Sequence, residues 1–332
     1  MFTKLLIPDF FNPDKVKEVY RVPYQQRAAE AETWAKNNNI QPASKDNKRV
    51  GLLLIDVQNT FCIPDFELFV NGAVEDNIRL CEFIYRNLGT ITKIIPTMDS
   101  HTAMQIFHPI FWVNKAGEHP APATMISYAD VKEGKWLVNL ELANSLIQGN
   151  CDRLEQHALY YVKKLSEDGK YPLTIWPYHS MLGGIGHALV SAVEEAVFFH
   201  SIARKSQTSF ELKGSNPLTE NYSVLSPEVI DSVDGESIAN KNTNLINKLL
   251  DFDALIIAGQ AKSHCVAWTI DNLLTEIKKV DINLAQKIYL LEDCMSPVVI
   301  PEVVDFTDRA NETFQKFADA GMNLVKSTDE LF

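Results

Sequence analysis

One stretch in the last quarter of the chain restricts its fold more than any other. Residues 255–258 are all apolar, Gly259 follows them, and a short polar turn leads on to Cys265. A continuous apolar run of this length, closed by glycine, predicts a buried strand of a parallel sheet. After the turn, apolar residues recur at helical spacing, at Val266, Ile270, Leu273, Leu274 and Ile277. The stretch therefore predicts a strand, a turn and a helix that begins at Cys265.

The position of Cys265 gives it a chemical interpretation. At a helix N-terminus, unpaired N–H groups and the positive end of the helix dipole favour the thiolate over the thiol. Units of strand, turn and helix also carry the nucleophile of other hydrolases. A lone cysteine is more often a small buried apolar residue, however. The choice between the two interpretations depends on the rest of the chain.

Composition restricts the partners and the compartment. The chain has 332 residues and a formal net charge of −12, which disfavours nucleic acid and anionic membranes as partners. Its five cysteines are scattered and form no CxxC pair, which is typical of a protein from a reducing compartment. The apolar run within residues 1–9 is too short for a signal peptide, and no run approaches the roughly 20 apolar residues of a membrane helix. These features together predict a cytoplasmic protein.

Strand and helix patterns alternate from residue 50 onward. This alternation predicts an α/β fold, a three-layer α/β/α arrangement around a mostly parallel sheet. We expect residues 1–48 to form an extension with a helix over 25–36, and residues 49–332 to form one domain with an insertion at about 115–170. The expected strands are 50–56, 90–97, 173–176, 210–213, 255–259, 287–292 and 323–325. The expected helices are 72–88, 136–148, 152–164, 187–202, 236–250, 265–277 and 303–321.

Polar residues follow the expected strands at the point where each one ends, namely Asp56, Asp99, His101, His179, Lys213 and Cys265. In open α/β sheets, functional groups gather at the carboxyl ends of the strands. An Asp-x-His pair in extended backbone places both side chains on one side, roughly 6–7 Å apart, as two ligands of one metal ion require. Such pairs are also common on protein surfaces, and Lys213 by itself would be an ordinary solvated lysine. The order of the whole set favours a functional site.

The order and spacing of these residues resemble the isochorismatase-like cysteine hydrolases, and among them the nicotinamidases. The resemblance spans roughly residues 50–327. The matching motifs are Asp56-Val57-Gln58-Asn59-x-Phe61-Cys62, Asp99-x-His101, Trp176-Pro177-x-His179, Lys213-Gly214 with Tyr222-Ser223, and Gly259-x-Ala261-x-x-His264-Cys265-Val266.

The resemblance implies an isochorismatase-like hydrolase fold and a catalytic triad of Cys265, Asp56 and Lys213. In the triad the thiolate attacks an amide carbonyl, the aspartate carries the proton, and the lysine holds both anionic groups by its charge. The resemblance also implies an oxyanion hole of the backbone N–H groups of Ala261 and Cys265. A cis peptide bond is implied between Gln260 and Ala261.

By the same resemblance, Asp99, His101 and His179 would bind one divalent metal ion, either zinc, iron or manganese. His108 is a further candidate ligand, or else a histidine packed into a loop. The side chains of Phe61, Trp176 and Tyr222 would line a pocket for a flat ring, or else be ordinary core aromatics.

The sequence therefore predicts a metal-dependent cysteine amidohydrolase whose small-molecule substrate is an amide. Nicotinamide is the expected substrate, which would become nicotinate and ammonia through a thioester on Cys265. A hydrolase of another small amide and a non-catalytic binding or scaffold protein are the alternatives. Assembly into a homo-oligomer is left open by the sequence.

Overall fold

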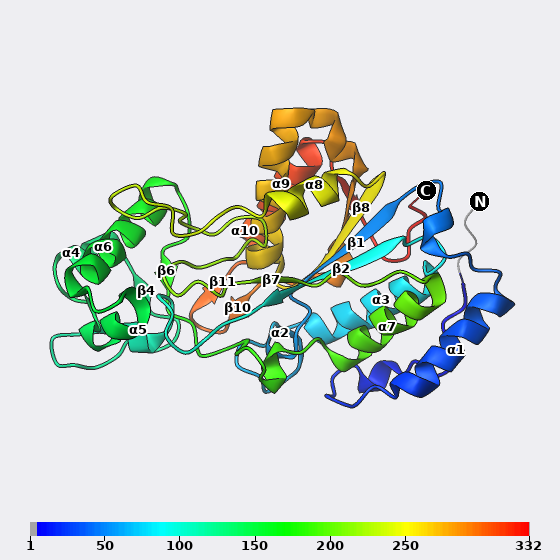
Figure 1. Cartoon of the computed structure of the whole chain (residues 1–332), viewed down its shortest axis with the longest axis horizontal. Helices are drawn as coiled ribbons and strands as arrows, with labels where there is room; N and C mark the ends of the chain where they lie inside the picture. The colour runs from blue at the N-terminus through cyan, green and yellow to red at the C-terminus, as the bar shows by residue number, and fades with distance from the viewer. Residues whose placement is uncertain (1–4, 332) are drawn as a thin grey trace.

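A six-stranded parallel sheet forms the centre of the computed structural model, which describes residues 5–331 (Figure 1). Residues 1–4, which open the extension and its apolar run, and residue 332 lie outside the described part. The strand order is β12-β9-β8-β1-β2-β7. The strands are β1 (Val50–Ile55), β2 (Lys93–Asp99), β7 (Glu211–Lys213), β8 (Ala254–Gly259), β9 (Ile288–Leu291) and β12 (Asn323–Val325).

The two strands at the centre of the sheet are continuous apolar runs because both of their faces are covered. Every residue of β1 and of β8 is buried. The two strands pair in parallel over their full length, from Val50 opposite Ala254 to Ile55 opposite Gly259. The strand predicted before Cys265 is therefore confirmed, and it lies in the middle of the sheet.

Three helices cover one face of the sheet (Figure 1). They are α1 (Tyr24–Asn37), α3 (Ala73–Arg86) and α7 (Ser191–Arg204). Leu52 and Leu54 of β1 point into this layer, as the period of two along a strand requires.

Three other helices cover the opposite face. They are α8 (Thr243–Leu250), α9 (Ala267–Val280) and α10 (Thr307–Asp319). Leu53 and Ile55 of β1 point into this second layer. The predicted α/β/α arrangement is thereby confirmed.

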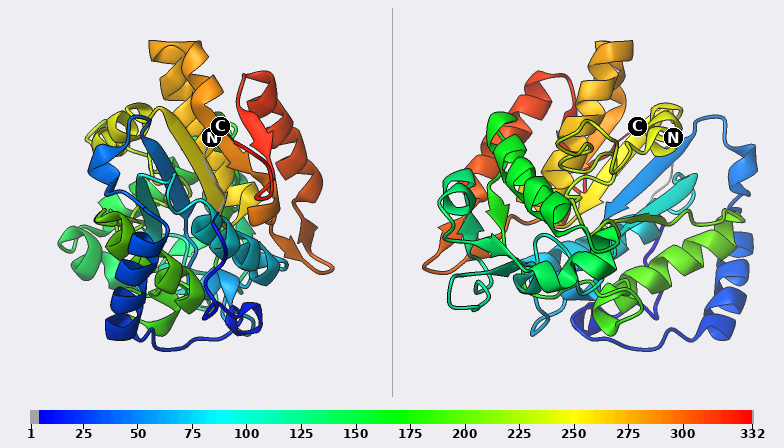
Figure 2. Two further views of the ribbon diagram at one scale, coloured as in Figure 1. Left: turned by 90° about the vertical axis from the view of Figure 1, so that its right-hand side faces the viewer. Right: turned by 60° about the vertical axis from the view of Figure 1, so that its left-hand side comes forward.

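The N-terminal residues pack along the outer side of α7, where Figure 2 shows α1 beside that helix. A buried ion pair fixes the contact, because Arg27 lies 2.6 Å from Glu195 of α7. The hydroxyl of Tyr20 also donates to Glu195, over 2.8 Å. Two 3-10 turns complete the segment, Pro13–Lys15 and Ala43–Lys45. Its separation at residue 48 from one following domain stays a prediction.

Residues 115–170 form a group of short elements at one end of the sheet (Figure 1). The group contains α4 (Tyr128–Lys132), α5 (Ala143–Ile147) and α6 (Cys151–Glu167), with β3 (Trp112–Val113) paired to β5 (Leu137–Val138). The helix predicted over 152–164 is confirmed as α6. The helix predicted over 136–148 is wrong, because its first residues form β5 and Asn139 caps a 3-10 turn at Leu140–Leu142.

The strand predicted over 173–176 does not belong to the central sheet. Its first two residues form β6 (Leu173–Thr174), which pairs antiparallel with β4 (Met125–Ile126). Ile175 donates its N–H to Thr124 O, and Trp176 donates its N–H to Phe107 O. The apolar run indicated a buried strand correctly, but the run carries no information on which strand is its partner.

The remaining elements are short. They are α2 (Asn59–Cys62), the β10 (Val299–Ile300) and β11 (Val304–Asp305) hairpin, and 3-10 turns at Pro109–Phe111, Ile185–His187, Ile282–Lys287 and Glu292–Cys294. Within residues 5–331, no helix is both long enough and apolar enough to cross a membrane.

Candidate active site

Four adjacent strands bring the predicted residues to one edge of the sheet. Asp56 directly follows β1, Asp99 ends β2, Lys213 ends β7, and Cys265 follows β8 after a turn. Because neighbouring parallel strands end at the same edge, residues far apart in the sequence become neighbours there. Asp99 and Lys213 are direct partners in the register of β2 and β7.

The turn that carries Cys265 is a π-helical turn, Lys262–Val266, which leads directly into α9. The N–H groups of His264 and Val266 both donate to the carbonyl of Ala261, which closes the turn. The preceding Gln260–Ala261 peptide bond is cis, as the resemblance implied. Cys265 is thus held at the junction of strand and helix that the sequence predicted.

Lys213 lies at the centre of a buried cluster of charged groups. Its Nζ is 3.0 Å from Asp56 Oδ2, 2.8 Å from Asp99 Oδ1 and 3.7 Å from Cys265 Sγ. A further hydrogen bond runs from Nζ to the carbonyl of Asn221, over 2.8 Å. Lys213 is therefore not the solvated lysine that it would be in isolation, since one ammonium faces two carboxylates and the thiol.

The electrostatics of the cluster differ from the expectation for the thiol. Burial raises the pKa of Cys265 well above its usual value, and the charges of Asp56 and Asp99 raise it further, although Lys213 lowers it. Burial likewise raises the pKa of Asp56, against the opposing charge of Lys213. Although burial alone lowers the pKa of Lys213, the two carboxylates raise it well above the usual range. The resting thiol is therefore protonated, and the expected thiolate from the helix terminus alone is wrong.

Asp99, His101 and His179 present ligand atoms that all lie within 4.8 Å of one another. His101 Nε2 is 2.7 Å from Asp99 Oδ2, and His179 Nε2 is 3.5 Å from the same oxygen. His179 reaches this position from a loop, because its segment lies outside the central sheet. A short bridge between His101 and Met181 holds that loop against the end of β2.

The hydrogen bonds behind these two histidines fit a bound cation. His101 Nδ1 contacts the carbonyl of Gly214 at 3.1 Å, and His179 Nδ1 contacts that of Pro177 at 2.8 Å. Since carbonyls only accept, each Nδ1 carries the proton and each neutral ring directs its Nε2 lone pair at the Asp99 carboxylate. Two lone pairs facing a carboxylate repel it unless a positive ion lies between them, so the three side chains are suited to a divalent metal.

His108 lies beside this group without belonging to it. Its ring centroid is 5.9 Å from that of His101 and 6.0 Å from that of His179. Its Nδ1 contacts the carbonyl of Ala103, while its Nε2 is buried without a hydrogen-bond partner among the described residues. Burial and the two neighbouring histidines lower the pKa of His108 to about 3. The neutral ring stays beside the ligand group, and its own role as a ligand stays a prediction.

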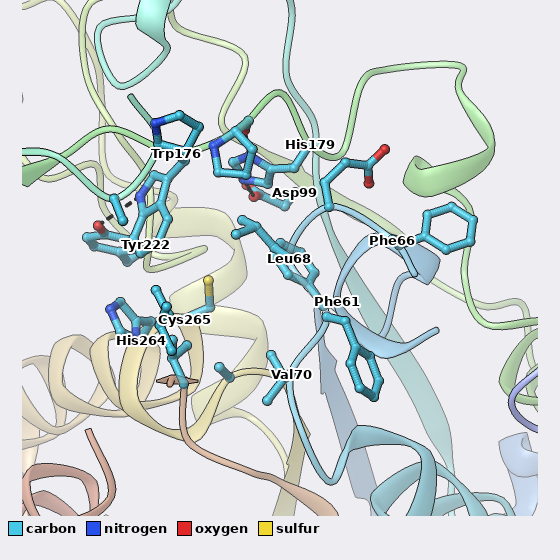
Figure 3. A pocket seen from close by; sticks show the side chains of 18 of the residues that line it. Phe61, Phe66, Leu68, Val70, Asp99, Trp176, His179, Tyr222, His264 and Cys265 are labelled. Carbon is cyan, nitrogen blue, oxygen red and sulfur yellow. Dashed lines mark hydrogen bonds and ion pairs between the residues drawn. The ribbon is translucent and has the colours of Figure 1, made fainter. Parts of the chain in front are cut away.

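One cavity of about 420 Å³ connects the metal ligands to Cys265. The predicted ring-binding residues Phe61, Trp176 and Tyr222 all line it, as does Ala261. Figure 3 shows Trp176 and Tyr222 on one side of the Cys265 sulfur and Phe61 on the other. A flat ring between these aromatic walls would have the thiol and the metal ligands at its edges.

Known proteins resemble this chain in structure rather than in sequence. No protein-family model matches the sequence, and no curated protein is significantly similar to it. Among solved structures, the nicotinamidase and pyrazinamidase of Acinetobacter baumanii matches with a TM-score of 0.53 and 17% identity, over 86% of this chain and 100% of that one. The chain has the nicotinamidase fold. The yeast nicotinamidase Pnc1p matches with a TM-score of 0.49 and 17% identity, over 83% of this chain and 99% of that one.

Two residues for which no sequence pattern indicated a role hold the nicotinamidase-fold site in place. Thr97 donates to Asp56 Oδ1 over 2.6 Å and accepts from the Asp56 N–H. Gln58 donates to the carbonyl of Asp99 and accepts from the Asp99 N–H, at 2.9 and 2.8 Å. Thr97 stands two positions before Asp99 on β2, and this period of two was the only available signal that it faces the site.

A second pair holds the turn before Cys265 from behind. The amide of Gln260 donates to Asp76 of α3 over 2.8 Å and accepts from the N–H of Ser296 over 3.2 Å. Asp76 is buried and is also paired with Arg79 at 2.7 Å. Asp76 and Ser296 are more than 30 residues from Gln260 in sequence, so no local pattern could have indicated the contact.

Proposed function

We propose that this chain is a metal-assisted cysteine amidohydrolase that converts nicotinamide to nicotinate and ammonia. The observation that carries the proposal is the shared cavity, which has Cys265 at one side and the Nε2 atoms of His101 and His179 at the other. A cysteine and a metal-ligand set directed into one cavity suit a substrate with a carbonyl at one edge and a basic ring nitrogen at another. The shared fold supports the proposal but does not by itself determine the activity.

Proton transfer in the first step would run from Cys265 to Asp56. Because the resting thiol is protonated, attack on the amide carbon requires a base within reach. Asp56 is completely buried, and the neighbouring ammonium of Lys213 favours its ionised form. As sulfur bonds to the carbonyl carbon, the thiol proton passes to Asp56 and the developing sulfur charge is stabilised by Lys213.

Asp56 would return the proton in the next step. The C–N bond breaks, the nitrogen takes the proton from Asp56, and ammonia leaves a thioester on Cys265. A water molecule then donates a proton to Asp56 and attacks the thioester carbon, which releases nicotinate and restores the thiol. The backbone N–H groups of Ala261 and Cys265, both at the cavity wall, would stabilise the oxyanion of each tetrahedral intermediate.

The ring of the substrate would be held at its nitrogen and at its two faces. A divalent ion on Asp99, His101 and His179 would supply a Lewis-acid contact for the ring nitrogen. Zinc, iron and manganese all suit one carboxylate with two imidazoles. The aromatic walls at Phe61 and Trp176 would restrict the substrate to a flat ring.

Steady-state ammonia release from nicotinamide, pyrazinamide and benzamide tests the proposal. Nicotinamide and pyrazinamide should be cleaved, whereas benzamide should be poorer by roughly a hundredfold or more in kcat/KM, because it has no ring nitrogen. Trapping the acylated Cys265 by rapid acid quench and mass spectrometry tests the thioester directly. Equal rates on nicotinamide and benzamide, or no release from any of the three amides, would overturn it.

A further inference from the structure

The cavity has a second part that the proposed reaction on nicotinamide leaves unused. Beyond the aromatic walls it is lined by residues that we call the apolar arm, namely Phe66, Leu68, Val70, Val298 and Ile300. Figure 3 shows Leu68 and Val70 on the side of the Cys265 sulfur opposite Trp176 and Tyr222. The apolar arm therefore begins next to the reacting atoms.

The two walls of the apolar arm are anchored to the catalytic elements. The N–H of Leu68 donates to Thr60 O over 3.2 Å, and that of Val70 donates to Phe61 O over 2.8 Å. On the other side, the N–H of Val298 donates to the hydroxyl of Ser263, two residues before Cys265, over 3.0 Å. The arm is thus a fixed part of the same pocket.

The size of the cavity exceeds the needs of a single-ring amide. Its volume of about 420 Å³ lies within the range of sites that bury drug-sized ligands, roughly 300–1000 Å³. Most of the arm is apolar, and its one carboxylate, Glu67, is bound to the hydroxyl of Thr60 over 2.9 Å. Water in such a space makes few hydrogen bonds, so an apolar group of a substrate would displace it favourably.

The leaving-group end of the site cannot use this space. The nitrogen that departs must take its proton from Asp56, which is fully buried and is not among the residues that line the cavity. Lys213 and Thr97 contact both oxygens of that carboxylate, which leaves a small and polar pocket around it. The leaving group is therefore ammonia, and the additional volume serves the acyl side of the substrate.

We infer that the substrate class is the primary amides of pyridine carboxylic acids that carry an apolar substituent on the ring, and that the apolar arm binds the substituent. The inference rests on the proposed function, because it uses the same thiol and the same ring-nitrogen contact. Each methylene buried in the arm should raise kcat/KM about fourfold, which corresponds to about 0.8 kcal/mol. A propyl group should therefore raise kcat/KM at least tenfold.

The test compares nicotinamide, 5-propylnicotinamide and 5-(2-hydroxyethyl)nicotinamide, which have equal or near-equal electronic effects on the amide. The propyl compound should have a kcat/KM at least tenfold above that of nicotinamide, and the hydroxyethyl compound should not. In Leu68→Trp, whose larger side chain fills the arm, the ratio of propyl to unsubstituted kcat/KM should fall to about one or below. The matched control is Val280→Trp at the exposed end of α9, 70% exposed, which should keep the wild-type ratio.

A binding measurement separates failure of this inference from failure of the proposed function. Calorimetry on the Cys265→Ala protein loaded with metal compares the affinities of the same three amides without turnover. Tighter binding of the propyl compound that Leu68→Trp removes would support the arm even if no amide were cleaved. Equal affinities and equal kcat/KM for the propyl and unsubstituted amides, or equal responses of both to Leu68→Trp, would overturn the inference.

Discussion

The backbone of Gly214 lies directly against the imidazole of His101. Its carbonyl contacts His101 Nδ1 at 3.1 Å, and a Cβ atom at position 214 would lie only 2.6 Å from the ring carbon Cε1. The same Cβ would lie 2.9 Å from Asp99 Oδ1. Gly214 also has a φ of +84°, a conformation that L side chains rarely adopt. Glycine is therefore required at this position both by the backbone and by the metal ligands.

Replacement of this glycine should damage the ligand set more than the fold. We expect Gly214→Ala to cost about 1–2 kcal/mol of stability from its backbone conformation and to weaken metal binding by roughly 10–100-fold, because it displaces His101. Gly117→Ala is the matched control, since Gly117 has a φ of +81° and a Cβ added there would have no atom within 4 Å. Metal titration and chemical denaturation measure the two effects. Equal metal affinity in both variants would contradict the expectation.

Loss of the thiol should abolish hydrolysis and leave the fold intact. We expect Cys265→Ala and Cys265→Ser to lower kcat by at least about 10⁴-fold, as is typical when a nucleophile is removed. Cys151→Ala is the control, because Cys151 is half-buried in α6 and lies outside the cavity lining. Ammonia release and the melting temperature are the measurements. Substantial turnover by Cys265→Ala would exclude the thioester route.

Removal of the central ammonium should lower both stability and activity. In Lys213→Met two buried carboxylates, Asp56 and Asp99, lose their shared cation, and breaking a buried pair in this way costs about 3–5 kcal/mol. The exposed pair of Lys205 and Glu32 gives the control, since Lys205→Met should cost less than about 1 kcal/mol. Urea unfolding of the two variants compares them. If Lys213→Met were as stable as Lys205→Met, the buried cluster would not have the charges assigned to it.

The metal site predicts a defined stoichiometry. Elemental analysis of purified protein should find about one equivalent of a divalent metal on Asp99, His101 and His179. Dialysis against a chelator should remove the metal and the activity together, and added zinc, iron or manganese should restore both. His179→Ala should not hold the ion, whereas His119→Ala, an exposed histidine away from the ligand set, should retain it. Full turnover by the metal-free protein would contradict this role.

Acid should destabilise the fold through a buried histidine remote from the site. Burial lowers the pKa of His200 from its usual value of 6.5 to about 4, and its Nε2 donates to Ile91 O over 2.8 Å. Between pH 6.5 and about 4 the unfolded chain binds a proton there that the folded chain does not, so stability is present above this range and is lost as the pH falls. The free energy of unfolding should fall by about 2 kcal/mol from this group between about pH 7 and 5. His200→Gln should show a smaller loss by that amount; an identical pH dependence would refute the assignment.

The sheet and the residues at its edge were predictable because each signal is local. An apolar run followed by a polar residue marks the end of a buried strand, and Asp56, Asp99 and Lys213 each follow this rule. Parallel strands then bring the residues together without further information. The pairing of β6 was not predictable, because a two-residue ladder depends on which loop lies beside it.

The protonation state of Cys265 shows a different limit. The helix terminus is a local feature and favours a thiolate, but burial and two carboxylates from β1 and β2 outweigh it. The contacts of Thr97 and Gln58 depend on the same convergence of distant strands. A sequence can therefore indicate which residues meet more readily than it indicates what their proximity does to a proton.

The position of β8 between β1 and β9 has a consequence for synthesis on the ribosome. β1 is made early, but its partner along its full length is completed only at Gly259, some 200 residues later. Until then the emerging chain exposes one edge of an apolar strand, the kind of edge that pairs with other chains. Slow long-range pairing of this kind leaves nascent chains open to aggregation. A chaperone that shields β1 during translation would therefore affect the yield of this protein more than its final stability.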